Sequence, residues 1–307
     1  MKKIYLSLVL LASLWGEEAS ELNRLSLSVN DEGAPAFSVP VNWNKHYFSA
    51  VSYASSQSKN HESIDDDRGK AEFVSGSDIT EAAINVLSYQ DTTAGGLIYA
   101  VGVSLSYGED EFDSVGYAYQ SSTNYFAQHS AGRGRLYQGG AYADIAQTKL
   151  ANFFSYRVGL YVYPLTYLDF ENTITSVPTP TYDETIHDKS MQSVLQYDLY
   201  ATALIEFSSY VNLLVDATLQ HRNLERPFID YASSSRQDYV TVNYEYDLMA
   251  ISGGAKLLFP FIAYGGISPS IGIKYTKIKE ENHLSSNVTL NEETTSTTYT
   301  VGFDKPF

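Results

Sequence analysis

The chain has 307 residues, no cysteine and a formal net charge of −16, from 36 acidic and 20 basic side chains. The lack of cysteine excludes disulfides and a lipoprotein anchor, and this charge disfavours nucleic acid and simple attraction to anionic lipid as partners. Tyrosine and phenylalanine are abundant, with 26 and 14 residues. Because its ring is apolar and its hydroxyl is polar, tyrosine is well suited to a membrane–water interface.

The N-terminus has the pattern of a secretory signal peptide. Met1, Lys2 and Lys3 form a short basic start, and an apolar run follows from Ile4 to Leu14. This run is too short to span a membrane comfortably. We therefore expect a signal peptide over residues 1–16, with cleavage as late as residue 20, and a mature chain over residues 17–307. No long apolar stretch follows it, so the sequence predicts no transmembrane helix.

The rest of the chain reads as strands, because apolar residues recur at every second position. The expected strands cover residues 25–30, 36–41, 46–55, 70–90, 97–107, 136–147, 152–172, 195–207, 211–222, 240–248, 267–275 and 299–307. Bulges are expected near 75–78 and 249–252. The alternation is clearest over 195–222, where it persists beyond the roughly 5–6 residues of an average soluble strand. A tilted membrane strand needs about 9–11 residues.

Short and long connections alternate along the chain. Short turns are expected near residues 43, 93, 149, 208 and 262, and long polar outer loops near 56–69, 108–134, 173–189, 223–238 and 280–293. Membrane barrels place short turns in the periplasm and long loops outside. The predicted fold is all-β, a single antiparallel transmembrane β-barrel of about 12 strands. The number rises to 14 if 108–134 contains a hairpin, and falls to 10 if the N-terminal segment is a plug.

The C-terminal strand carries an apolar face made of Tyr299, Val301, Phe303 and Phe307. The ending resembles the C-terminal signal of Gram-negative outer-membrane β-barrel proteins, roughly polar-x-Gly-x-x-apolar-x-aromatic. Thr300, Gly302 and Phe307 match that signal, whereas Lys305 departs from it. The resemblance implies the bacterial outer membrane, contact with its lipid and lipopolysaccharide, and assembly by the barrel-assembly machinery. That machinery would read Tyr299, Gly302, Phe303 and Phe307.

The polar faces of the later strands give candidate lumen residues: Asp144, Arg157, Asp198, Glu206, Asp216, Arg222, Glu245, Asp247 and Lys274. Carboxylates lining a wet lumen favour cations or neutral polar solutes. The sequence therefore predicts a narrow passive or substrate-selective channel. Two alternatives stay open. Facing charges such as Arg157 and Asp198 pair and fill a non-conducting structural or surface-interaction barrel, or a 14-stranded transporter of hydrophobic solutes holds the segment before Tyr47 as an internal plug.

No motif points to an enzyme, a metal or a cofactor. The six histidines are scattered. The pair His187–Asp188 and the run Asp65–Asp67 lack the spacing of a calcium loop. The basic stretch Gly132–Arg135 reads either as a flexible loop or as a contact for lipopolysaccharide phosphates.

Overall fold

The computed structural model describes residues 24–66, 69–121, 124–150, 153–177, 182–192, 195–231, 239–262, 267–285 and 288–306. Almost all of these residues lie in strands. The strands are β1 (Arg24–Asn30), β2 (Pro35–Asn42), β3 (Tyr47–Asp66), β4 (Gly69–Thr92), β5 (Leu97–Ser121), β6 (Asn124–Leu150), β7 (Phe154–Val177), β8 (Tyr182–Gln192), β9 (Gln196–Glu206), β10 (Asn212–Tyr231), β11 (Tyr239–Leu258), β12 (Ser268–Ser285) and β13 (Val288–Pro306). A single 3₁₀ turn, η1 (Pro260–Ile262), joins β11 to β12 within the described residues.

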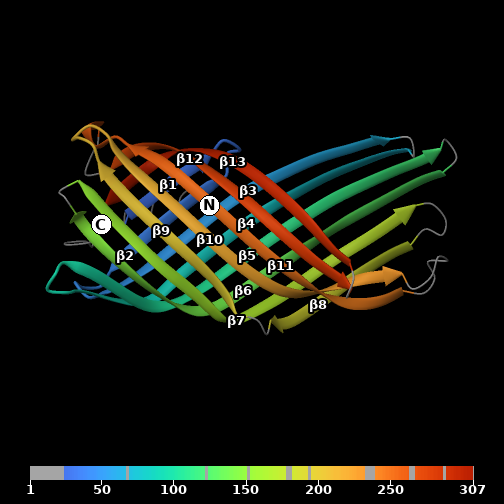
Figure 1. The fold of residues 1–307 in the computed structure, drawn as a ribbon, viewed down its shortest axis with the longest axis horizontal. Coiled ribbons are helices and arrows are strands. Elements are labelled where there is room, and N and C mark those ends of the chain that lie inside the picture. The colour runs from blue at the N-terminus through green and yellow to red at the C-terminus, as the bar shows by residue number, and fades with distance from the viewer. Residues whose placement is uncertain are drawn as a thin grey trace, which may run out of the picture.

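The strands form one closed antiparallel barrel (Figure 1). Apart from β8 and β9, consecutive strands pair with each other, and the first and last strands close the cylinder, from Arg24 opposite Pro306 to Asn30 opposite Thr300. Closure leaves no free sheet edge at this seam, which a wall surrounded by lipid requires. β7 pairs with β9 along one half of its length and with β8 along the other, so β8 and β9 share one position and the wall has the predicted 12 strands.

The wall changes character where β8 meets β10. The two strands share no backbone ladder, although β10 pairs with β9 on the side of this point toward the short turns. The amide of Gln196 accepts from the Asn223 backbone N–H at 2.9 Å and donates to the Asn223 carbonyl. Gln192 bonds the Glu225 backbone in the same way, at 2.7 and 3.3 Å. Two side-chain amides therefore replace the missing strand pairing and satisfy backbone groups that would be costly to leave unpaired.

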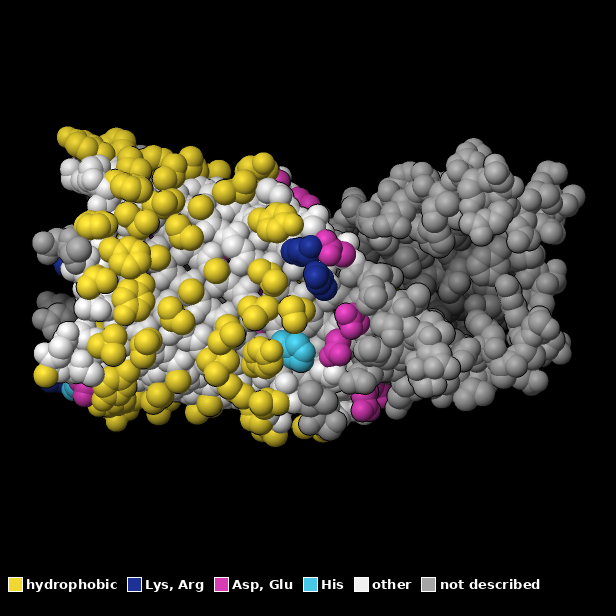
Figure 2. Space-filling model, viewed as in Figure 1, with side chains coloured by type: hydrophobic (Ala, Val, Ile, Leu, Met, Phe, Trp, Pro, Cys, Tyr) yellow, Lys and Arg dark blue, Asp and Glu magenta, His cyan; other side chains and the backbone are white. Residues whose placement is uncertain are grey.

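An apolar band covers the visible face of the barrel at the end with the short turns (Figure 2). Its outward side chains include Val101, Ile251 and Val301, which are 48, 49 and 67% exposed. Exposed aliphatic side chains in this number have no place in water and fit a lipid-facing wall. In the same view, charged side chains gather at the edge of the band toward the long hairpins.

Two aromatic girdles border the band. Near the short turns, the ring centroids of Tyr47 and Tyr89 are 5.4 Å apart and those of Tyr89 and Tyr99 are 6.3 Å apart. At the other edge, Tyr107 and Tyr137 are 5.1 Å apart. Tyr99 and Tyr107 are eight residues apart on β5, which at about 3.3 Å per residue and a tilt of about 40° gives roughly 20 Å along the barrel axis. This is a little less than the roughly 25 Å of the apolar band in outer-membrane barrels.

The segments expected as long outer loops are in fact strands. Residues 108–121 and 124–134 belong to β5 and β6, which are 25 and 27 residues long and form one hairpin without an extra pair of strands. The same holds for the described parts of 56–69, 173–189, 223–238 and 280–293. These sequences looked like loops because both faces of a hairpin beyond the membrane meet water, so polar residues need not alternate with apolar ones. The basic stretch Gly132–Arg135 is also part of a strand, β6, and not a loop.

One alternative and two expectations fail elsewhere in the chain. β1 and β2 are wall strands, so the segment from residue 24 to Tyr47 is not an internal plug. β4 has its irregularity at Asn85/Leu87 instead of near 75–78. β11 runs without a register shift through 249–252. The expected signal peptide and Phe307 lie outside the described residues. Among the helical segments described, none could cross a membrane.

Candidate functional site in the barrel lumen

Inward-facing side chains fill much of the lumen, and small residues allow the filling. Gly159 shows the constraint most clearly, because a Cβ there would lie 2.5 Å from the ring of Tyr200 and 2.6 Å from the Cβ of Asp144. Asn85 on β4 donates to the Tyr161 hydroxyl on β7 at 3.2 Å, which is a contact across the lumen between strands that do not pair. Inward side chains therefore reach one another across part of the lumen.

An apolar plug crosses the lumen at the end with the short turns. It consists of Ala146, Leu204 and Leu258, which are at most 2% exposed, with Ile98 and Leu214 packed against them. These five side chains come from β5, β6, β9, β10 and β11. Burial of these aliphatic groups in mutual contact keeps water away from the plug itself.

A polar layer lies on the long-hairpin side of the plug and holds two ion pairs. Arg157 Nε lies 3.7 Å from Asp144 Oδ2, which also accepts a hydrogen bond of 2.7 Å from the Tyr200 hydroxyl. Lys256 Nζ lies 3.3 Å from Asp304 Oδ1. Asp144 and Asp304 are 7 and 1% exposed. Charges at this burial are tolerable only when they are paired and hydrogen-bonded, as these are.

The lower cavity, of 360 Å³, lies within this layer. Its lining includes both ion pairs, the side chains of Phe48, Tyr142, Tyr161, Tyr200 and Thr202, and the carboxylate of Asp216. The rings of Tyr142 and Tyr161 are 5.0 Å apart, and those of Tyr161 and Tyr200 are 5.3 Å apart. The cavity therefore combines charged hydrogen-bonding groups with a tyrosine cluster.

The upper cavity, of 630 Å³, lies on the long-hairpin side of the polar layer. Its lining is mixed: the polar side chains include Glu81, Gln138 and Gln220, and the apolar ones include Ile79, Phe112, Leu136, Leu168, Phe170, Leu224, Leu248, Ala250 and Ile278. Asp198 and Arg222 also line it as a bidentate pair, in which Arg222 Nη2 donates to Asp198 Oδ2 at 3.0 Å and Nη1 donates to Oδ1. The guanidinium lies 5.4 Å from the centre of the Tyr163 ring. Ser26 and Ser38 line both cavities.

The structure gathers some of the predicted lumen residues and separates others. Asp144, Arg157 and Asp216 line the lower cavity, and Asp198 and Arg222 line the upper one. The other inward-facing members are Glu206, at the short-turn end of β9, and Lys274, on β12.

Two expectations about these side chains are corrected. Asp198 pairs with Arg222 and not with Arg157, because the register places Asp198 opposite Tyr161. Asp247 lies on the outer wall beside His221, since β11 lacks the bulge that would have turned its carboxylate inward. The side chain of Glu245 lies outside the described residues.

Sequence reasoning missed Lys256 and the tyrosine cluster. Lys256 falls on the inward face only if β11 is read without a slip, with Leu257 pointing outward at 37% exposure. Composition alone places the tyrosines at the membrane interface as a class. Alternation with Val158 and Leu160 already placed Tyr161 inward, so the signal was present.

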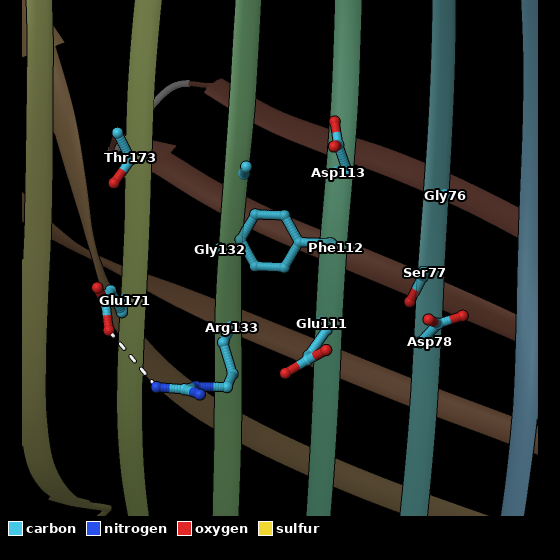
Figure 3. Close-up of a pocket in the computed structure, with 11 residues that line it drawn as sticks. Gly76, Ser77, Asp78, Glu111, Phe112, Asp113, Gly132, Arg133, Glu171 and Thr173 are labelled. Atoms are coloured by element: carbon cyan, nitrogen blue, oxygen red, sulfur yellow. Dashed lines mark ion pairs between the residues drawn. The ribbon is translucent and has the colours of Figure 1, made fainter.

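The outer wall carries a charged groove beyond the upper girdle (Figure 3). Arg133 Nη2 lies 3.7 Å from Glu171 on this outer face, whereas the Phe112 ring lies against Gly132 on the inner face, where it stacks on Phe170. Nearby, Arg135 donates to Glu109 at 2.8 Å, and this bond is the main cause that lowers the pKa of the Glu109 carboxyl. The basic stretch is thus part of a network of opposite charges. Among the described residues, no group of His, Asp and Glu is placed to hold a metal ion.

Closed strand pairing, an outward apolar band and two girdles define the architecture of an outer-membrane β-barrel. No protein-family model matches the sequence, and no curated protein is detectably similar to it.

Solved structures match this one at low similarity. The Pseudomonas putida toluene transporter TodX matches with a TM-score of 0.47 and 10% identity, over 93% of this chain and 87% of that one. The translocator domain of the autotransporter NalP from Neisseria meningitidis matches with 0.46 and 8%, over 100 and 95%. The β-domain of the Bordetella autotransporter BrkA matches with 0.45 and 12%, over 83 and 98%. Because all three scores lie below 0.5, the fold assignment rests on the strand pairing and the band.

Proposed function

We propose that the protein is a narrow, substrate-selective channel of the bacterial outer membrane, closed in this conformation, for small solutes without net charge. The short turns would face the periplasm and the long hairpins the exterior, as membrane barrels generally arrange them. The single observation that supports this proposal best is the upper cavity of 630 Å³, which lies above the polar layer and the apolar plug.

The electrostatics of the lumen favour an uncharged solute. Asp144, Asp198 and Asp304 each have a cationic partner within the lumen. A paired carboxylate offers little field to a passing ion, and a lone ion would lose its hydration without compensation. The apolar side chains of the upper cavity can bind the apolar part of a neutral solute.

Passage would require two groups of contacts to open. The ion pairs of the polar layer would have to exchange partners or take water, and the plug of Ala146, Leu204 and Leu258 would have to separate. A channel of this design conducts rarely or briefly and leaks little.

Planar-bilayer recording of the refolded protein, combined with swelling of protein-loaded liposomes, tests the proposal. We expect no steady ion conductance from the native chain but measurable uptake of small neutral solutes. A permanently open pore with ohmic current would contradict the closed lumen. A barrel that neither conducts nor admits any neutral solute would contradict the channel.

A non-conducting surface-interaction barrel is the second candidate. β5 and β6, of 25 and 27 residues, extend far beyond the roughly 9–11 residues that a membrane span needs. Their long projection outside the membrane would suit contact with other surfaces. Shortening these hairpins would then abolish contact with those surfaces while leaving solute uptake unchanged.

A further inference from the structure

We propose that the barrel wall opens sideways between β8 and β10, and that an uncharged solute with a large apolar part passes there between the upper cavity and the outer leaflet of the membrane. The line along which these two strands face each other is called the lateral seam below. The inference rests on the proposed channel function, because it gives the solute of the upper cavity an exit. Along this route the apolar plug stays closed.

The lateral seam is a break in the backbone pairing of the wall. The ladder between β9 and β10 ends at Tyr197 opposite His221. Beyond this pair, within the described strands, β10 forms a ladder with β11 alone and β8 with β7 alone. The two facing edges therefore depend on side chains to hold them together.

Two buried glutamine side chains close the seam from the inside. Gln192 and Gln196 are 7 and 0% exposed. The Gln192 amide accepts from the Glu225 backbone N–H at 2.7 Å and donates to the carbonyl of the same residue at 3.3 Å. Gln196 bonds the backbone of Asn223 in the same two ways. Opening here breaks side-chain hydrogen bonds and leaves the β7–β8 and β10–β11 ladders intact, so the seam can part locally while the barrel stays folded.

The seam begins within the apolar band and reaches the girdle near the long hairpins. Its base lies opposite Tyr163 on β7, and Met191 of β8 lies opposite Tyr167, whose ring centroid is 6.0 Å from that of Tyr137 in this girdle. The step from Tyr163 to Tyr167 corresponds to roughly 10 Å along the barrel axis. On the outer wall beside the seam, Met191 and Leu195 are 61 and 51% exposed. A solute that leaves through the base of the seam therefore enters lipid.

The upper cavity reaches the seam from the inside. Its lining includes Leu168 and Phe170 on β7 and Leu224 on β10, the two strands on either side of β8, and these side chains are 4, 8 and 9% exposed. Apolar side chains thus lie at both ends of the path, with the two amides between them. An apolar group moves from such a cavity into lipid without passing the charged groups of the polar layer, whereas a charged solute would lose its hydration on this route.

Reversible cross-linking of the seam tests the gate after the barrel has folded. Met191→Cys and Glu225→Cys place two thiols on the outer wall, one on each side of the seam, in a chain that has no other cysteine. Gln192 bonds the backbone of Glu225, so this double variant keeps the closing amide contacts. A short bifunctional methanethiosulfonate joins the two thiols, a reductant releases them, and mass spectrometry measures the extent of linkage.

The assay follows N-phenyl-1-naphthylamine, an uncharged apolar probe that fluoresces in lipid, as it enters Gram-negative cells carrying the protein in their outer membrane. We expect the native chain and the unlinked variant to speed its uptake relative to cells without the protein. Cross-linking should return uptake to the level of those cells, and reduction should restore it. The matched control is Lys277→Cys with Thr295→Cys, since these residues lie opposite each other in the β12–β13 ladder. Its cross-link should leave uptake unchanged.

Gln192→Ala removes one closing side chain and leaves the outer wall unaltered. It should raise probe uptake by up to about tenfold, because the loss of its two hydrogen bonds shifts the seam toward its open form. An unchanged rate would contradict the closing role of this amide.

Probe uptake that persists after complete cross-linking of the seam would refute the gate, and so would an equal loss in the control pair. Swelling of liposomes in hydrophilic neutral solutes reports passage along the barrel axis separately. Seam-dependent uptake of the probe without any swelling would retain the gate and refute the axial channel. Swelling together with probe uptake that ignores the seam cross-link would retain the channel and refute the gate.

Discussion

Removal of one plug side chain should affect stability and closure together. Leu258 is fully buried, and Leu258→Ala removes three carbons from contact with Leu204 and Ala146. At about 0.8 kcal/mol per buried carbon, the lost transfer free energy is about 2.4 kcal/mol. A cavity term of about 1 kcal/mol adds to it, because the wall strands cannot collapse inward. The free energy of unfolding should therefore fall by about 3–4 kcal/mol.

Urea unfolding in lipid vesicles measures this loss, with fluorescence of Trp43 at the short-turn end as the probe. Leu257→Ala is the matched control. The Leu257 side chain points outward and is 37% exposed, so its removal leaves no enclosed cavity. It should cost about 2 kcal/mol or less. Only the Leu258 variant should raise ion conductance in a planar bilayer. Equal destabilisation by the two variants, or conductance unchanged in both, would refute the assignment of Leu258 to a lumen plug.

The polar contacts give three further predictions. Arg222→Met leaves the buried carboxylate of Asp198 unpaired and should cost about 3–5 kcal/mol, whereas adding Asp198→Leu should recover much of that loss in a double-mutant unfolding cycle. Gln196→Glu keeps the acceptor but removes the donor to the Asn223 carbonyl, so it should cost about 1–3 kcal/mol and speed hydrogen exchange of nearby β10 amides. Unchanged exchange there would contradict the sealing role of the amide. The lowered pKa of Glu109 adds stability that is present above its unfolded pKa and is lost as the pH falls through its folded pKa. Glu109→Gln should therefore flatten the acid limb of the stability–pH profile, and an unchanged limb would exclude this contribution.

The barrel could be predicted from the sequence because its wall obeys a simple rule. A strand between lipid and lumen must alternate, and the runs beginning at Leu97 and Leu195 alternate over a full membrane span. Counting such runs along the sequence gives the twelve strand positions of the wall. The long hairpins could not be recognised in the same way, because residues such as those of 108–134 extend beyond the lipid and carry no regular alternation.

The lumen was only partly predictable for a related reason. Alternation assigns a side chain to a face, but it does not give the register across strands, and register decides that Asp198 pairs with Arg222. A single assumed bulge in β11 was enough to turn Asp247 inward and to hide Lys256. The tyrosines inside the barrel have the same composition signal as those in the girdles, so composition alone cannot separate the two groups.

The central claim is that the lumen is closed toward the short turns. Thiol labelling of a lumen residue tests this claim most directly. The chain has no cysteine, so Gln220→Cys places a single thiol in the upper cavity. In proteoliposomes of known orientation, a membrane-impermeant maleimide should react from the long-hairpin side and not from the short-turn side. Reaction at equal rates from both sides would show a continuous pore and contradict the closed lumen.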